Sequence, residues 1–200
     1  MPHVFAMCRS HCSLPSTDCI KPLVTAGFDV NHQDHNGATI LHYLCGSTYY
    51  EDLTQKVDLI EYLLDHGADW ALPAHGLRGD TVLHRLARIA DVGTGFNLLI
   101  RKIARECRGN QGIAAVNEDG DRVLSIYLSM EADLPPPGGA ETAMLLAQAG
   151  CSLNVLNKKG RAVAHHVLSV LLTVEWVDIL EGLGMDLSLP DSEEDRLCIT

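Results

Sequence analysis

The chain has 200 residues, of which 46% are hydrophobic and 20% are charged, and its formal net charge is −11. These values are typical of an ordinary soluble domain or a short repeat array, and the negative charge argues against a nucleic-acid partner. No apolar run approaches the roughly 18 residues of a membrane span, and residues 1–15 lack the basic start and long apolar core of a signal peptide. We therefore expect an intracellular protein, cytoplasmic or nuclear, with no membrane contact.

The seven cysteines predict reduced thiols rather than a disulfide framework, because their number is odd and no C-x-x-C pair occurs. The soft metal ligands closest together in the sequence are His3, Cys8, His11, Cys12 and Cys19. A zinc site usually has two residues between paired cysteines, whereas Cys8 and Cys12 have three between them, the i,i+4 spacing of one helix face. We expect these cysteines to pack a helix, with no metal or other cofactor; metal binding remains the weaker alternative.

Residues 1–31 are interpreted as the later part of a first structural unit. A helix is expected to start near Thr17 or Asp18 and to end before Gly27. Pro22 would break a helix interior, so we expect it close to the first turn of this helix.

The next stretch, residues 31–42, predicts a tight turn followed by a helix. Residues 34–37 (D-H-N-G) are turn formers, because glycine accepts a positive φ and Asp and Asn bond to their own backbone. Thr39 then stands where a helix needs an N-cap oxygen, before an apolar face. His42 lies inside that face, and we interpret it as a hydrogen-bonding strut between turns rather than as a ligand or a general base.

This turn-helix unit recurs along the chain. Its turn glycines are Gly37, Gly79, Gly120 and Gly160, which are 42, 41 and 40 residues apart (79−37, 120−79, 160−120). A second series of glycines, each after an apolar helical pattern, marks the end of a second helix in the unit: Gly27, Gly67, Gly150 and Gly184.

The run Thr39-Ile40-Leu41-His42 behind the turn at Gly37 resembles the T-P-L-H signature of the ankyrin repeat. The spacing of about 40 residues would suit armadillo or HEAT units, but the ten residues from Gly27 to Gly37 fit the ankyrin hairpin. The extra residues fall between the two helices of a unit, as at 46–52 and 131–139. The resemblance implies an all-α ankyrin-repeat solenoid of stacked helix pairs. Its expected units are 1–31 (partial), 32–71, 72–114, 115–154, 155–188 and 189–200 (partial).

The third unit contains a predicted helix over residues 96–108 with an apolar face and a basic face. From Arg85 to Arg108 there are six basic residues (85, 88, 101, 102, 105 and 108) against Asp91 and Glu106, a local charge of +4. Such a patch could meet an acidic partner or nucleic acid, but we favour a solvated outer helix face.

The fourth unit has a stiff loop of three prolines at 135–137, which we interpret as a spacer, before a helix over 140–149. In the fifth unit His165 and His166 are adjacent, so one is expected to point inward and the other outward, which argues against a shared metal. Residues 192–198 align with residues 118–124 and would open a sixth unit. Neither end shows the polar cap that a terminal repeat normally carries.

No catalytic signature is present, so we expect no enzyme activity. By position, the resemblance implies a non-enzymatic protein-interaction module whose turn tips and first helices contact another protein. The implied contacts are His35, Asn36, Ala38 and Tyr43; Leu77, Arg78, Asp80 and Arg85; Glu118, Asp119 and Asp121; and Lys158, Lys159, Arg161 and His166. The third and fourth tips carry opposite charges, which indicates a polar groove. The alternatives are solvated turns without a partner, or a structural spacer in a larger protein.

Overall fold

A computed structural model describes residues 17–46, 53–90, 94–106, 112–129, 138–165 and 174–189. Within these ranges the regular structure is helical, and no strand occurs apart from two isolated β-bridges, Ala74 with Asp80 and Val116 with Arg122. The helices are α2 (Thr17–Thr25), α3 (Ile40–Leu44), α4 (Leu53–Asp65), the 3-10 turn η1 (His75–Leu77), α5 (Val82–Ala87), α6 (Thr94–Glu106), α7 (Val123–Leu128), α8 (Gly139–Gln148) and α10 (Val174–Gly182). The expectation of an all-α chain is confirmed at this level.

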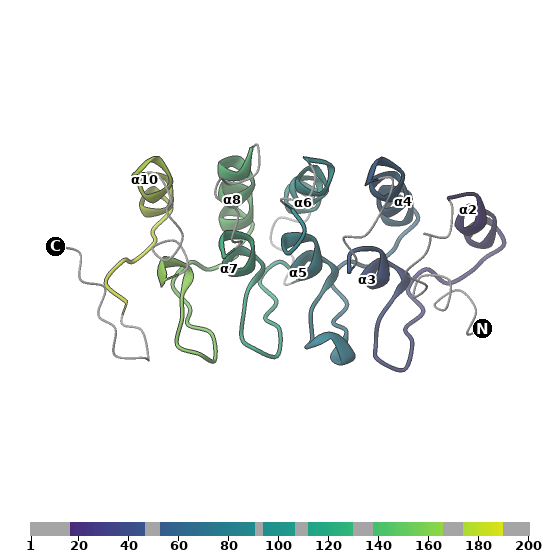
Figure 1. Ribbon diagram of the computed structural model, residues 1–200, viewed down its shortest axis with the longest axis horizontal. Coiled ribbons are helices and arrows are strands. Elements are labelled where there is room, and N and C mark those ends of the chain that lie inside the picture. The colour runs from purple at the N-terminus through teal and green to yellow at the C-terminus, as the bar shows by residue number, and fades with distance from the viewer. Residues whose placement is uncertain are drawn as a thin grey trace.

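The helices lie in two parallel rows (Figure 1). Short helices α3, α5 and α7 form one row, and α2, α4, α6, α8 and α10 form the other. From α3 onward, each helix packs on its neighbour along the row, as α5 does on α7 and α6 on α8. Helices α3, α5 and α7 each also pack on the following helix of the other row. The loops that precede the short helices project together from the far side of the short-helix row.

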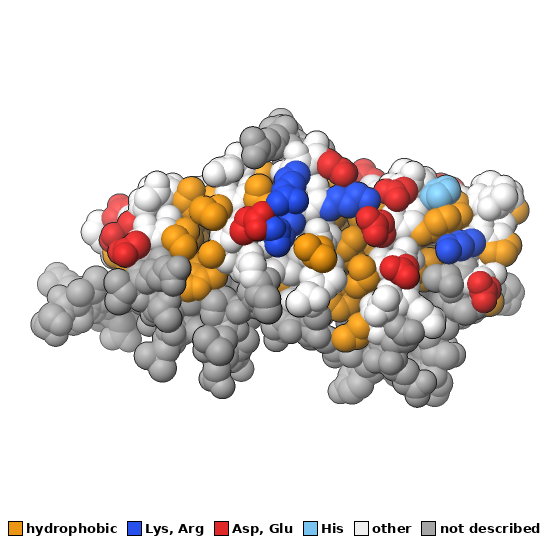
Figure 2. Space-filling view, turned by 90° about the horizontal axis from the view of Figure 1, so that it is seen from above, with side chains coloured by type: hydrophobic (Ala, Val, Ile, Leu, Met, Phe, Trp, Pro, Cys, Tyr) orange, Lys and Arg blue, Asp and Glu red, His pale blue; other side chains and the backbone are white. Residues whose placement is uncertain are grey.

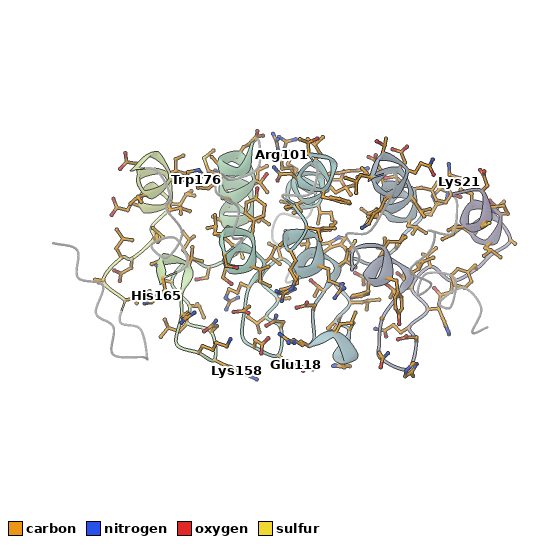
Figure 3. The ribbon with its side chains drawn as sticks, in the orientation of Figure 1. Lys21, Arg101, Glu118, Lys158, His165 and Trp176 are labelled. Atoms are coloured by element: carbon orange, nitrogen blue, oxygen red, sulfur yellow. The ribbon has the colours of Figure 1, made fainter. Side chains whose placement is uncertain are left out.

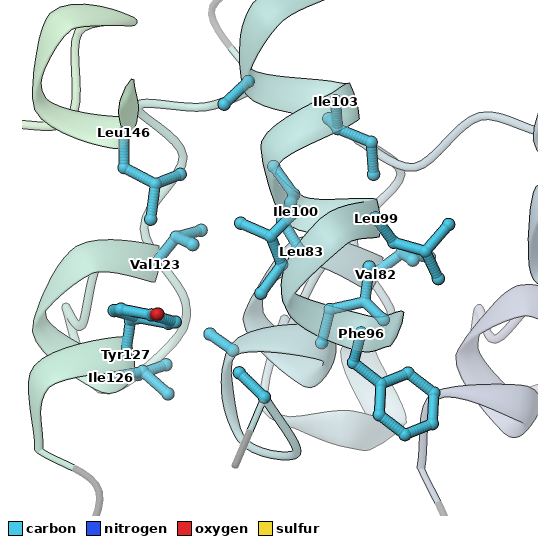
Figure 4. Close-up of a cluster of buried hydrophobic side chains, with 14 of the residues drawn as sticks. Val82, Leu83, Phe96, Leu99, Ile100, Ile103, Val123, Ile126, Tyr127 and Leu146 are labelled. Atoms are coloured by element: carbon cyan, nitrogen blue, oxygen red, sulfur yellow. The ribbon is translucent and has the colours of Figure 1, made fainter. Parts of the chain in front are cut away.

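The core lies between the two rows (Figure 4). The predicted apolar face of α6 is buried, with Phe96, Leu99, Ile100 and Ile103 at most 3% exposed. It packs near Val82 and Leu83 of α5 and near Val123, Ile126 and Tyr127 of α7. Burying one such side chain contributes about 1.5 to 3 kcal/mol, so packing between neighbouring helices supplies most of the driving force for folding.

One polar cluster interrupts this apolar core. Asn97 of α6 is 1% exposed, and its Oδ1 accepts hydrogen bonds from Tyr127 Oη of α7 (3.0 Å) and Thr142 Oγ1 of α8 (2.7 Å). Burial raises the pKa of Tyr127 to about 12, which keeps its hydroxyl protonated as a donor. Because three helices must be in register to satisfy this one amide, the cluster specifies how they dock.

The first described helix differs from its prediction in one respect. α2 begins at Thr17, as expected, but Pro22 lies well inside it rather than in the first turn. A proline there removes one intrahelical hydrogen bond, and this is tolerated because Pro22 and most of its neighbours face solvent while Ile20 is buried. The inter-helix segments at 47–52 and 130–137 and the sequence repeat at 192–198 lie outside the described residues.

Candidate functional site

Each of the four loops that carry the recurring glycines is closed by a hydrogen bond from its glycine, and the loop at Gly79 is two residues longer than the other three because it contains η1. In each, the glycine N–H donates to the carbonyl that opens the turn: Gly37 to Asp34, Gly79 to Ala74, Gly120 to Asn117 and Gly160 to Asn157, at 2.9 to 3.0 Å. The glycines have φ between 67° and 79°, the left-handed region that favours glycine. The turns predicted from sequence are therefore present at all four places.

Asx side chains hold three of these turns closed. Asn117 Oδ1 accepts hydrogen bonds from the N–H groups of Asp119 (3.0 Å) and Asp121 (2.9 Å), and Asn157 does the same in the next turn. Asp34 Oδ1 plays this part in the first turn. These side-chain bonds explain why the turns at Gly37, Gly120 and Gly160 have the same backbone shape.

Each turn is also bonded to the next. Gly76 N–H donates to Asn36 O (2.8 Å), Glu118 N–H to Arg78 O (2.8 Å), and Lys158 N–H to Asp119 O (2.9 Å). A further side-chain bond joins Asn117 Nδ2 to Asp80 Oδ1 (2.9 Å). We call the set of four linked turns, residues 34–38, 74–80, 117–121 and 157–161, the turn row.

The histidines at the start of the short helices connect the turn row to the helices. His42 is fully buried; its Nδ1 accepts a bond from Thr39 N–H (3.1 Å), and its Nε2 donates to the carbonyls of Leu72 (3.1 Å) and Asp80 (3.2 Å) in the next unit. His84 repeats this, with its Nε2 3.2 Å from Asp121 O. The predicted role of His42 as a strut is confirmed.

These contacts require a neutral imidazole, because Nδ1 must accept. Burial, with a smaller contribution from the Arg85 guanidinium, lowers the pKa of His42 to about 4. Burial also lowers the pKa of His84. His42 is therefore neutral near pH 7 and acts as a fixed structural bridge rather than as a proton carrier.

The structure brings most of the predicted contact residues together along the turn row. Exposed members are His35, Arg78, Glu118, Lys158, Lys159 and Arg161, and partly exposed ones are Asn36, Tyr43, Leu77, Arg85, Asp119 and Asp121. Figure 3 shows Glu118 and Lys158 at the free edge of neighbouring turns, away from both rows of helices. His166 lies outside the described residues.

Two of the predicted contacts are wrong. Ala38 is 0% exposed and Asp80 is 3% exposed, so a partner docked on the outside would not reach either side chain. The corresponding residues of the next two turns, Asp121 and Arg161, are partly exposed and exposed, so the position within the turn does not by itself decide burial. Asp80 accepts a bond from Asn117 and forms an ion pair with Arg88 (3.3 Å), so its carboxylate is already used within the chain.

Two others have structural contacts of their own. Arg85 Nε donates to His42 O (3.1 Å) at the end of α3, and Tyr43 Oη donates to Asp34 Oδ2 (2.5 Å). Arg85 therefore satisfies a helix carbonyl that would otherwise lack an intrahelical donor. The polar groups of both side chains are therefore used in hydrogen bonds within the chain.

The basic residues of α6 are neutralised by neighbouring helices. Lys102 Nζ lies 2.9 Å from Glu61 Oε1 and 3.0 Å from Asp65 Oδ1 of α4, and Arg101 and Arg105 both pair with Glu141 of α8. Figure 2 shows these basic side chains with acidic ones on either side. The part of the predicted patch that lies on α6 is thus an ion-paired helix face, on which Arg105 is exposed, Lys102 partly exposed and Arg101 largely covered; Arg108 lies outside the described residues.

Sequence reasoning missed a pair of asparagine clamps between units. Asn31 Nδ2 donates to Gly67 O (2.9 Å) while its Oδ1 accepts from Asp69 N–H (2.6 Å), and Asn154 holds Gly184 and Asp186 in the same way. The signal was present, because both asparagines stand four residues after a helix-ending glycine (31−27 and 154−150).

Replacing Asn117 by alanine should lower the free energy of unfolding by about 2 kcal/mol, because Asp80 loses a buried donor and two turn N–H groups lose their acceptor. Asn157→Ala removes the corresponding bonds at a more exposed turn and should cost clearly less. Urea unfolding followed by circular dichroism compares the two. Equal losses would show that burial of the Asn117–Asp80 contact does not matter.

Within the described ranges, no cluster of three or more His, Cys, Asp or Glu side chains could hold a metal ion. The amino-terminal candidates His3, Cys8, His11 and Cys12 lie outside those ranges, and Cys19 is exposed. The described helices are all too short or too polar to cross a membrane.

Comparison of the sequence with models of known protein families finds no match, and comparison with curated proteins finds none either.

Proposed function

We propose that this protein is an ankyrin-like repeat array without enzymatic activity, and that its turn row binds another protein. The observation that carries the proposal is the hydrogen-bonded ladder of four turns, each closed by a glycine at positive φ. A ladder of this kind holds side chains from distant parts of the sequence in one fixed line, which reduces the entropy lost when a partner binds.

The distribution of charges favours the turn row over the helical faces as the surface that binds a partner. Each basic side chain of α6 that was predicted to form a patch already has a carboxylate partner. On the turn row, by contrast, Glu118 and Lys158 have no ion-pair partner among the described residues. Solvated charges on a rigid edge can steer a partner and select it.

The experiment compares two variants with the wild-type protein in a pull-down from cell extract. The turn variant carries Arg78→Ala, Glu118→Ala and Lys158→Ala. The control variant carries Asp58→Ala, Glu106→Ala and Gln148→Ala, which lie exposed on α4, α6 and α8. Both must match the wild type in circular dichroism and in urea midpoint.

We expect proteins that are retained by the wild type and the control variant to be lost by the turn variant. Should all three forms retain the same proteins, the turn row is not the binding surface. That result would favour the alternative of a structural spacer within a larger protein.

A further inference from the structure

Beside the charges of the turn row, the residues directly before three of its turns form a set of exposed apolar side chains. Val116 is 50% exposed and Leu156 is 42% exposed. Each directly precedes the residue that opens its turn, Asn117 or Asn157, and Pro73 stands at the same place before Ala74 and is also exposed. Three successive turns therefore present an apolar side chain at one register position.

Charged tips accompany this set of apolar side chains, and their sign alternates from turn to turn. The turn at Gly79 carries Arg78, whose side chain is 75% exposed. The next turn carries Glu118 and Asp119, and the turn at Gly160 carries Lys158 and Lys159. In the last two turns the apolar residue lies only two positions before a charged one, so a partner along the row would meet both kinds of side chain.

A partner could bind these charges without breaking a strong ion pair within the chain. Glu118 and Lys158 take part in no ion pair in the described ranges. Arg78 pairs with Asp119 at 3.6 Å, but both side chains are well exposed, and such a pair contributes little stability that a partner would have to replace. An apolar centre with a charged rim is also the usual composition of a protein interface.

The distance between neighbouring turns determines how many residues of a bound segment lie between one charged residue and the next. Packed helices lie about 8 to 10 Å apart, so neighbouring turns are about that far apart as well. An extended segment in the polyproline II conformation has three residues per turn and advances about 3.1 Å per residue, so side chains three positions apart lie on the same side of it. About three residues of an extended partner therefore cover one turn.

We propose, resting on the function proposed above, that the turn row binds an extended segment of a partner protein whose charges alternate in sign about every third residue. An acidic residue faces the turn at Gly79, a basic residue faces Glu118, and a second acidic residue faces Lys158. Apolar side chains between them pack on Val116 and Leu156. The order acid-base-acid is the same in both chain directions, so the partner can run either way.

The test uses two synthetic peptides rather than an unknown partner. The first has the sequence Asp-Leu-Thr-Lys-Leu-Thr-Asp, and the second has every charge inverted. Binding of each labelled peptide is measured by fluorescence anisotropy at low ionic strength, where exposed charges are least screened. We expect the wild-type protein to bind the first peptide about tenfold more tightly than the second.

The decisive variant exchanges two charges on the protein, Glu118→Lys with Lys158→Glu, and keeps the net charge constant. We expect it to lose or reverse the preference. The control exchange Lys21→Glu with Asp58→Lys, at exposed sites on α2 and α4, should leave the preference unchanged.

Three outcomes overturn the proposal: no binding of either peptide, equal binding of both, or the same preference in the charge-exchanged protein. None of these affects the pull-down comparison of the turn variant. If that comparison succeeds while the peptide test fails, the turn row binds a protein, but not one with alternating charges.

Discussion

Replacement of Gly120 by alanine should lower the free energy of unfolding by about 3 kcal/mol or more. The glycine has φ of 79°, a conformation that costs an alanine about 1 to 2 kcal/mol. A Cβ atom at this position would also lie 2.9 Å from the backbone nitrogen of Lys158 and 3.2 Å from the Cα of Asn157. Because these are backbone atoms, the next turn itself must shift, and the bond from Lys158 N–H to Asp119 O is strained.

Gly67 provides the matched control. Its φ is 83°, but an added Cβ would meet no atom within 4 Å, so Gly67→Ala should cost only the conformational part, about 1 to 2 kcal/mol. The midpoint of urea unfolding, followed by circular dichroism, measures both variants. Similar losses in the two would mean that contact between neighbouring turns contributes little to stability.

Acidification from pH 7 to pH 4 should remove about 3 kcal/mol of stability through His42 alone. In the folded protein the pKa of this imidazole is about 4, against 6.5 in the unfolded chain. Between these values the unfolded chain binds the extra proton, so the stabilisation is complete above pH 6.5 and is lost as the pH falls towards 4. Protonation would give Nδ1 a hydrogen where it must accept one from Thr39 N–H.

Substitution separates this effect from that of other acid-sensitive groups. His42→Gln should be less stable than the wild type at neutral pH, but its stability should fall by about 3 kcal/mol less on acidification. His35→Gln, at a side chain that is 73% exposed, should keep the full pH dependence. Guanidinium unfolding curves at several pH values measure all three proteins. Parallel curves for wild type and His42→Gln would contradict the assignment.

Local features of the fold could be predicted from the sequence because their causes lie within a few residues. The turn glycines need a positive φ, and Thr39 precedes the first buried residue of α3, so both are visible in a short window. The strut role of His42 also followed from its place in an apolar run that recurs. The same reasoning defined the apolar face of α6, where Phe96 and Ile100 are buried.

Apart from the strut role of His42, contacts between units could not be predicted, because the two partners are about 40 residues apart. Asp80 was assigned to the outer surface, yet it is buried by Asn117 of the following turn. Arg85 was assigned to a partner, yet it donates to His42 O, which lies 43 residues earlier. The position of a residue within its own turn indicates its backbone conformation, but not whether the next turn covers it.

The charge of the α6 surface could not be predicted for the same reason. Counting charges along residues 85–108 gave a local excess of basic residues, because a sequence window contains only one helix. Lys102 is paired with Glu61 and Asp65 of the helix before, and Arg105 with Glu141 of the helix after. In a stack of helices, the net charge of a surface depends on the charged residues of the neighbouring helices, which lie about one repeat away in the sequence.

The bonds that join one turn to the next are made by main-chain atoms, such as those from Glu118 N–H to Arg78 O and from Lys158 N–H to Asp119 O. The side chains at these tips take no part in them. Mutation can therefore exchange Arg78, Glu118 or Lys158 for other residues while the framework is inherited unchanged. Under the binding function proposed here, a change of partner would require new side chains at the tips and no change of fold.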